Sequence, residues 1–141
     1  MFVKQISVFL ENKPGRLFNL TKTLAENGLD IFHITVAETS EYGVIRCVTK
    51  DSGRAIEVLK GAGFAVSVTD LVGVDIDDRP GSLNEVLAFL SEKNVQIEYL
   101  YSFSRNAGKN AAILLKIDNN PEAAAKLLTE NGIKLITDLT K

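Results

Sequence analysis

The residues of this chain that could do chemistry gather in two short loops of nearly the same sequence. Pro14-Gly15 in the first loop and Pro80-Gly81 in the second lie 66 residues apart, and each pair precedes an apolar run with helical spacing. The candidate ligand-binding residues are Asn12, Lys13, Pro14, Gly15, Arg16 and Leu17 in the first loop, and Asp78, Arg79, Pro80, Gly81, Ser82 and Leu83 in the second.

A loop that leads into a helix suits a small ligand that carries both a negative and a positive charge. A helix start offers unpaired backbone N–H groups and a partial positive charge, which favour a carboxylate. Gly15 and Gly81 have no Cβ, so a ligand could approach the backbone closely. Short polar side chains nearby could take an ammonium group, as an α-amino acid requires. The alternative is purely structural, because Asn12 or Asp78 could simply be the N-cap of a well-formed strand-to-helix turn.

The two loops differ in chemistry. Asn12 can both donate and accept hydrogen bonds, whereas an ionised Asp78 only accepts them and so favours an ammonium group. Arg16 in the first loop corresponds to Ser82 in the second. We therefore expect the two loops to differ in ligand affinity, and one of them to be the better site.

The remaining reactive side chains do not predict an enzyme. His33 is the only histidine and lies in a predicted strand, where packing is the more common role. Cys47 is the only cysteine and has no CxxC partner, so a buried structural thiol is expected. The sequence has no zinc-ligand spacing and no phosphate-binding GxxxxGK[ST]. Asp77 and Asp78 alone are too few carboxylates for a metal site. We therefore expect no catalytic residue, no metal and no cofactor.

The composition excludes several classes of partner. The net charge is −2 and no basic block is present, so binding of nucleic acid is not expected. Tyr99, Tyr101 and Phe103 could stack on bases, but the first copy has non-aromatic or imidazole side chains at the matching positions (His33, Thr35, Ala37). No signal peptide core or membrane-spanning run is found. A soluble, cytoplasmic protein with no membrane contact is expected.

The duplication extends over almost the whole chain and predicts two domains, residues 1–70 and 71–141. Ile6, Val8 and Leu10 alternate as in a strand, and Leu17, Leu20 and Leu24 follow at helical spacing. The later elements of the first copy are expected at 30–37, 44–49, 52–62 and 64–69. Those of the second copy are expected at 71–77, 80–93, 95–104, 111–118, 121–131 and 133–139. Three extra residues in the second copy fall near residues 104–110, where a longer hairpin loop is expected.

The alternation in two strands leaves the helix-free face of the sheet open to two interpretations. Ile97, Tyr99, Tyr101 and Phe103 would share one side of their strand. In the first copy, Ile31 would lie on one side, and Phe32, Ile34 and Val36 on the other. Aromatic residues are common in strands for general reasons. The alternative is that another chain covers this face, most simply in a homodimer.

Two βαββαβ units, each with [Asn/Asp]-x-Pro-Gly-x-Leu after its first strand, resemble the ACT domain, a ferredoxin-like α+β fold. The resemblance implies two units that pair side by side through their second strands into an eight-stranded antiparallel sheet with the helices on one face. It also implies a ligand between one unit's Pro-Gly loop and the second strand of the other. The residues of those strands that would face the ligand are His33, Ile34, Tyr99 and Leu100.

The same resemblance implies a regulatory function. ACT domains commonly bind amino acids, and they usually regulate a catalytic domain on the same chain, which is not seen in this sequence. We therefore expect a non-catalytic regulatory protein that binds an amino acid at the interface between its two ACT domains, forms a homodimer and acts on a metabolic enzyme. The alternative is a pairing subunit of such an enzyme that binds no ligand.

Overall fold

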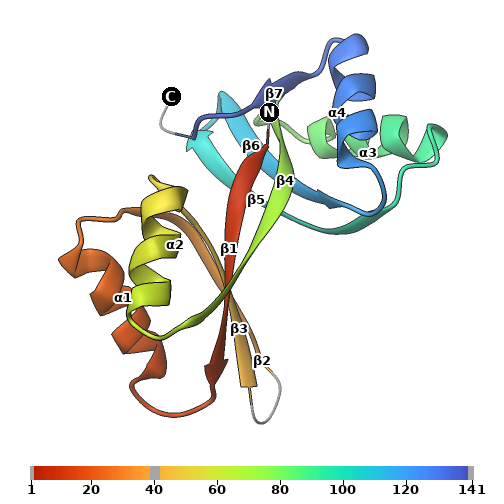
Figure 1. The fold of residues 1–141 in the computed structure, drawn as a ribbon. Coiled ribbons are helices and arrows are strands. Elements are labelled where there is room, and N and C mark those ends of the chain that lie inside the picture. The colour runs from red at the N-terminus through yellow and green to blue at the C-terminus, as the bar shows by residue number, and fades with distance from the viewer. Residues whose placement is uncertain (1, 39–41, 140–141) are drawn as a thin grey trace. The chain divides into compact units, whose positions relative to one another are not determined.

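A computed structural model describes residues 2–38 and 42–139 and shows two compact units. Of the described residues, the first unit contains Lys4–Thr69 and Leu139, and the second contains Asp70–Asp138 together with Phe2 and Val3. The elements in chain order (Figure 1) are β1 (Val3–Glu11), α1 (Arg16–Glu26), β2 (Ile31–Glu38), β3 (Tyr42–Thr49), α2 (Ser52–Gly61), β4 (Ala65–Asp77), α3 (Ser82–Glu92), β5 (Ile97–Asn106), β6 (Asn110–Ile117), α4 (Pro121–Glu130) and β7 (Lys134–Ile136). The α+β class and the βαββαβ order of each copy are confirmed.

The first unit buries one face of its sheet beneath α1 and α2. Ile6 of β1 lies opposite Cys47 of β3, and Val8 lies opposite Ile45 in the antiparallel register. Side chains opposite each other project to the same face of a sheet. The core that results combines both helices with alternate strand residues: Ile6, Val8, Leu10, Leu20, Leu24, Leu29, Ile45, Cys47, Ala55 and Leu59. Cys47 is therefore the expected structural thiol, and burial raises its pKa to about 11.

The second unit repeats this packing with a separate core. Its strands lie in the order β5-β6-β4-β7, and all of these pairs are antiparallel. The core side chains come from α3, α4, β4 and β6: Val72, Val74, Val86, Leu90, Ile113, Leu115, Ile117, Ala124, Ala125 and Leu128. The last strand is shorter than the expected 133–139, because β7 pairs with β4 only through residues 134–136.

The described sheet has seven strands, so the expected eight-stranded sheet is corrected. The expected strands 64–69 and 71–77 form the single strand β4, because residues 65–72 contain no glycine or proline that would break it. Residues 73–75 of β4 already pair on one side with β6 and on the other with β7. The β1 pairing therefore falls on the earlier part of β4. Among the described strands, β2 pairs with β3 and β5 pairs with β6.

A β-bulge at the same place in each copy corrects the predicted strand faces. The register shifts between Ile31 and His33 in β2, and between Ile97 and Tyr99 in β5. A bulge places two residues opposite one and reverses the side to which the following residues point. Ile97 therefore packs against the second core, while Tyr99 projects to the other face. The mixed alternation thus has a local cause and does not require a covering chain.

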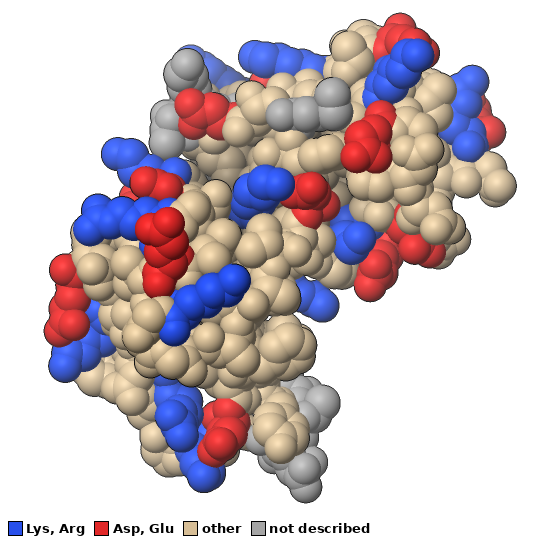
Figure 2. Space-filling model, in the orientation of Figure 1, with Lys and Arg blue, Asp and Glu red and all other residues tan. Residues whose placement is uncertain are grey.

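Charged side chains of both signs are interspersed over the face shown in Figure 2. Several of them form exposed ion pairs, such as Lys22–Glu26 at 3.7 Å within α1. Pairs of this kind are weak individually, so the charges that matter for function must be identified from burial and local geometry. Within the described ranges, no helix is both long and apolar enough to cross a membrane.

Candidate ligand site

The two Pro-Gly loops form a tight turn before the helix. Gly15 and Gly81 adopt left-handed backbone angles, with φ of 87° and 92°, and are themselves the N-caps of α1 and α3. The expectation that Asn12 or Asp78 caps the helix is therefore wrong. The reason is an extra turn, in which the N–H of Arg79 donates to Asp77 O at 3.0 Å and delays the helix until Ser82. Among the described residues no side chain caps either helix, and the first N–H of each helix, at Arg16 and at Ser82, donates at 3.3 Å to the carbonyl oxygen of Lys13 and of Arg79 respectively.

Asp78 fastens the loop of the second unit to the β5–β6 hairpin. The N–H of Gly108 donates to Asp78 Oδ2 at 2.8 Å, and the N–H of Asp78 donates to Lys109 O at 3.0 Å. The hairpin is the segment that is three residues longer in the second copy. One oxygen of the Asp78 carboxylate is thus already occupied within the fold, which assigns this residue a structural role that the sequence did not indicate.

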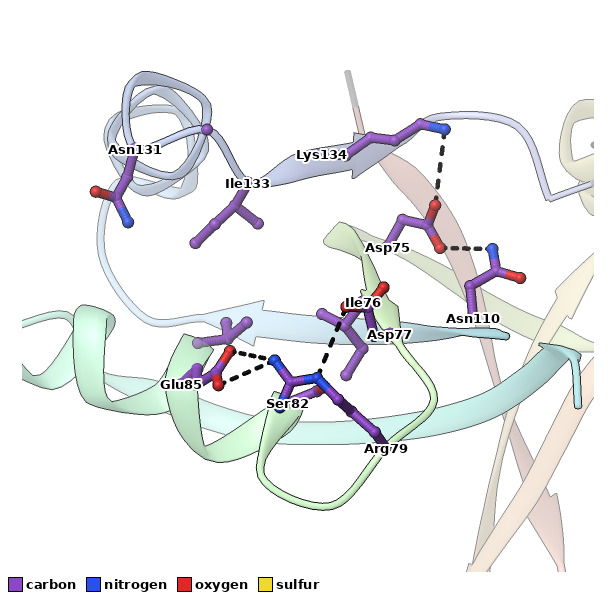
Figure 3. Close-up of a pocket in the computed structure, with 12 residues that line it drawn as sticks. Asp75, Ile76, Asp77, Arg79, Ser82, Glu85, Asn110, Asn131, Ile133 and Lys134 are labelled. Carbon is purple, nitrogen blue, oxygen red and sulfur yellow. Dashed lines mark hydrogen bonds and ion pairs between the residues drawn. The ribbon is translucent and has the colours of Figure 1, made fainter. Parts of the chain in front are cut away.

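A cavity of about 480 Å³ lies beside the Pro-Gly loop of the second unit (Figure 3). It is lined by the end of β4, the start of α3 and the turn between α4 and β7. The polar and charged side chains of its wall are Asp75, Asp77, Arg79, Ser82, Glu85, Asn110, Asn131 and Lys134. Its volume falls within the usual range for small-molecule sites.

The charged groups of this cavity are paired with one another. Arg79 Nη2 lies 3.0 Å and 3.1 Å from the two carboxylate oxygens of Glu85, and Arg79 Nε lies 3.7 Å from Asp77 Oδ2. On the opposite wall, Lys134 Nζ lies 3.7 Å from Asp75 Oδ2, and Asn110 Nδ2 donates to Asp75 Oδ1 at 2.9 Å. These pairs are drawn in Figure 3. The side chain of Asp75 is only 13% exposed, so this carboxylate interacts more strongly than the solvated ones.

Ser82 is the least satisfied polar group in the wall of the cavity. The residue is 4% exposed, and its hydroxyl has no hydrogen-bond partner among the described residues. A buried hydroxyl without a partner costs about 1–3 kcal/mol. Ser82 is the first residue of α3, so this hydroxyl lies at the positive end of the helix.

The first unit has a matching cavity of about 450 Å³ with a different lining. Phe9 replaces Asp75, and Ala65 replaces Lys134, so the Asp75–Lys134 ion pair of the second unit has no counterpart. Arg16 stands where the second unit has Ser82, and it lies 3.8 Å from Glu11. The pKa of Glu11 is lowered, first by a hydrogen bond from Lys13 and then by the charges of Lys13 and Arg16.

The structure brings only some of the predicted site residues to these two cavities. Arg79, Ser82 and Arg16 line them, while the other loop residues form the turn or the start of the helix. His33, Ile34, Tyr99 and Leu100 lie on the edge strands β2 and β5 and line neither cavity. Burial lowers the pKa of His33.

Six polar residues of the cavity wall were not among the predicted ligand residues: Asp75, Asp77, Glu85, Asn110, Asn131 and Lys134. The duplication held a signal for two of them. Aligning the copies would have shown a carboxylate in place of Phe9 and an ammonium in place of Ala65. These two positions are apolar in the first copy and carry opposite charges in the second. Such a difference favours a binding role for the second copy.

Comparisons with known proteins agree with this architecture. The fold and the paired Pro-Gly loops define a double domain, and the family model described as "ACT domain pair" matches residues 1–140. The chain therefore belongs to the ACT domain pair family, which confirms the resemblance. No curated protein matches the sequence.

Several solved structures share this fold. Protein BT0572 from Bacteroides thetaiotaomicron is 37% identical, with a TM-score of 0.92, and the match covers 100% of this chain and 97% of that one. The ligand-free regulatory subunit of aspartate kinase from Thermus thermophilus is 16% identical, with a TM-score of 0.65, over 92% and 93% of the two chains. The corresponding subunit from Thermus flavus is 18% identical, with a TM-score of 0.59, over 92% of each chain. At these lower identities the two Thermus structures show the fold alone.

Proposed function

We propose that this chain is a non-catalytic regulatory protein that binds an amino acid beside the Pro-Gly loop of its second unit. The observation that carries the proposal is the cavity there, which presents carboxylates and cations on facing walls. An α-amino acid carries an ammonium and a carboxylate a few ångströms apart, so both of its charges find partners. Membership of the ACT domain pair family supports a regulatory function.

The regulation would work by a shift in population. A ligand that contacts the end of β4, the start of α3 and the α4–β7 turn favours the arrangement in which these three segments are held together. Two structures with the same fold are described as regulatory subunits of aspartate kinase. On that basis we propose that a separate metabolic enzyme responds to the ligand-bound form.

We also propose that two chains associate through the β2 edge of the first unit. Ile34 and Val36 are 37% and 44% exposed, and they lie opposite Cys47 and Ile45, on the helix-bearing face of the sheet. On α1 of the same unit, Phe18 is 65% exposed. An edge strand with exposed apolar side chains favours pairing with another strand. Such pairing is how His33–Ile34, or Tyr99–Leu100 of β5, would come to face the loop of a neighbouring unit.

The same exposed edge supports the second candidate function, a pairing subunit that binds no ligand. The two functions make different predictions for a thermal-shift screen of the twenty common amino acids. A ligand at 100 times its dissociation constant stabilises the native state by about 2.7 kcal/mol. At this chain length, we expect one or a few amino acids to raise the melting temperature by roughly 2–8 °C.

A matched pair of variants localises the effect in that screen. Lys134→Ala removes the cavity's ammonium, and Lys126→Ala removes an equally exposed lysine that pairs with Glu130 on α4. We expect Lys134→Ala to reduce the melting rise and Lys126→Ala to leave it unchanged. If no amino acid raises the melting temperature of the wild-type protein, the pairing subunit is the better account.

A further inference from the structure

Asparagine is followed by glycine at two places in the chain, Asn27-Gly28 and Asn131-Gly132. Glycine has no Cβ, so its backbone nitrogen can reach the side-chain Cγ of the asparagine before it. The new N–Cγ bond replaces the Cγ–Nδ2 bond, and the proton of the glycine N–H leaves with the amide nitrogen as ammonia. Water then opens the resulting succinimide to aspartate or isoaspartate. These two positions are therefore the places where the sequence favours a spontaneous modification.

The backbone is almost the same at the two positions. Asn27 is the C-cap of α1, with φ of −101° and ψ of 11°, and Asn131 is the C-cap of α4, with φ of −87° and ψ of 9°. In each case the glycine N–H donates at 3.0 Å to the carbonyl oxygen of the residue three positions earlier. This bond must open before the nitrogen can attack. It protects both positions to a similar degree, so a difference in reactivity must come from the side chains.

The side chains of the two asparagines differ. Asn27 is half-buried, and its Nδ2 donates to Thr23 O at 2.8 Å, which directs the amide back along α1 and away from Gly28. Asn131 is exposed, and no hydrogen bond holds its amide among the described residues. In Figure 3 it extends from the end of α4 without a bond to the other side chains drawn. Its Cγ is therefore free to turn toward the nitrogen of Gly132.

We propose that Asn131 is a site of spontaneous deamidation in the folded protein, whereas Asn27 is protected by its bond to Thr23. Either product adds a carboxylate at the C-terminal end of α4, where the helix dipole disfavours negative charge. Isoaspartate also adds one backbone atom to the short segment that leads to β7, which pairs with β4 through only three residues. Deamidation should therefore lower the melting temperature, whether or not an amino acid binds in the cavity.

Peptide mass spectrometry of the folded protein during incubation at mildly alkaline pH tests this proposal. We expect the amide-to-carboxylate mass change to accumulate about two- to tenfold faster at Asn131 than at Asn27, the difference that one hydrogen bond of ordinary strength makes. The same incubation in denaturant is the control. There the two asparagines should convert at equal rates, because both are followed by glycine and the fold holds neither. In the folded protein, equal rates, faster conversion at Asn27, or conversion at neither residue would overturn the proposal.

Asn131→Gln links the modification to stability. Glutamine would have to close a larger ring, which is slower, so this variant should show no mass change at that position. We expect incubation to lower the melting temperature of the wild-type protein progressively, and that of Asn131→Gln far less. Asn84→Gln is the matched control, because Asn84 is also exposed, lies on α3 and is followed by glutamate, and it should lose stability as the wild type does. An equal loss in Asn131→Gln would contradict the proposal.

Discussion

Replacing Leu90 by alanine is expected to lower the free energy of unfolding by about 2–5 kcal/mol, because it leaves a cavity in the second core. Leu90 is fully buried and lies on α3 in the cluster that joins both helices to β4 and β6. Chemical denaturation of the variant and the wild-type protein would give the difference. The helix that Leu90 anchors also carries Ser82 and Glu85, so ligand binding should weaken in parallel.

Leu24→Ala is the matched substitution in the first core, where Leu24 is also fully buried. The two cores are separate clusters, so each variant should mainly loosen its own unit. Amide hydrogen exchange should accelerate more in β6 for Leu90→Ala and more in β3 for Leu24→Ala. Equal acceleration in both strands for either variant would show that the two cores unfold as one.

Gly73→Ala is expected to destabilise the protein by about 1–3 kcal/mol through overpacking. A Cβ at this position would lie 2.9 Å from the backbone oxygen of Ile136 and 3.1 Å from Cγ2 of Val3. The nearest atom belongs to the backbone of β7, which cannot rotate away as a side chain can. Since β7 pairs with β4 through only three residues, we expect it to detach first, as a lower melting temperature and faster exchange at residues 134–136.

Gly61→Ala is the control for that substitution. Gly61 is the last residue of α2, and nothing lies within 4 Å of the Cβ it would gain. Alanine there should stabilise the protein by about 0.4–1 kcal/mol, because it reduces the freedom of the unfolded chain. If Gly73→Ala had the same effect as Gly61→Ala, the close approach of β4 and β7 would not be as described.

Much of the fold was predictable, because the sequence repeats its own pattern. Alternating Ile6, Val8 and Leu10 form β1, and the run from Leu17 to Leu24 forms α1. Gly28 adopts a left-handed φ of 67° just after α1, as expected for a helix end. The spacing of apolar residues and the glycine at a helix C-terminus are local properties of the sequence. In these elements they agree with the packing of the folded chain.

Other features of the fold depend on interactions that a local pattern does not contain. The bulge in β5 places Ile97 and Tyr99 on opposite faces of the sheet, and only the pairing with β6 reveals it. The continuous strand β4 replaced two expected strands because no residue between them breaks the extended chain. The length of β7 depends on how many residues of β4 it can reach.

The positions of the two Pro-Gly turns were predictable, but most of the side chains that line the cavity beside each turn were not. The Pro-Gly loops marked the helix starts correctly, and Arg79 and Ser82 do line a cavity there. Asp75 and Lys134 come from segments more than fifty residues apart, and only the fold brings them to within 3.7 Å. Asp78 looked like a ligand group or a helix cap, but it holds the hairpin at Gly108, a contact between distant residues.

The most direct test of amino-acid binding in the second unit is an NMR titration of the backbone amides with the amino acid that most raises the melting temperature. The account predicts that the largest shift changes occur in the segments 75–86 and 131–134, which contain most of the residues that line the cavity beside the second Pro-Gly loop. It predicts small changes at residues 9–19 and 62–65, which line the matching cavity of the first unit. Changes confined to the first unit, or none at saturating amino acid, would contradict it.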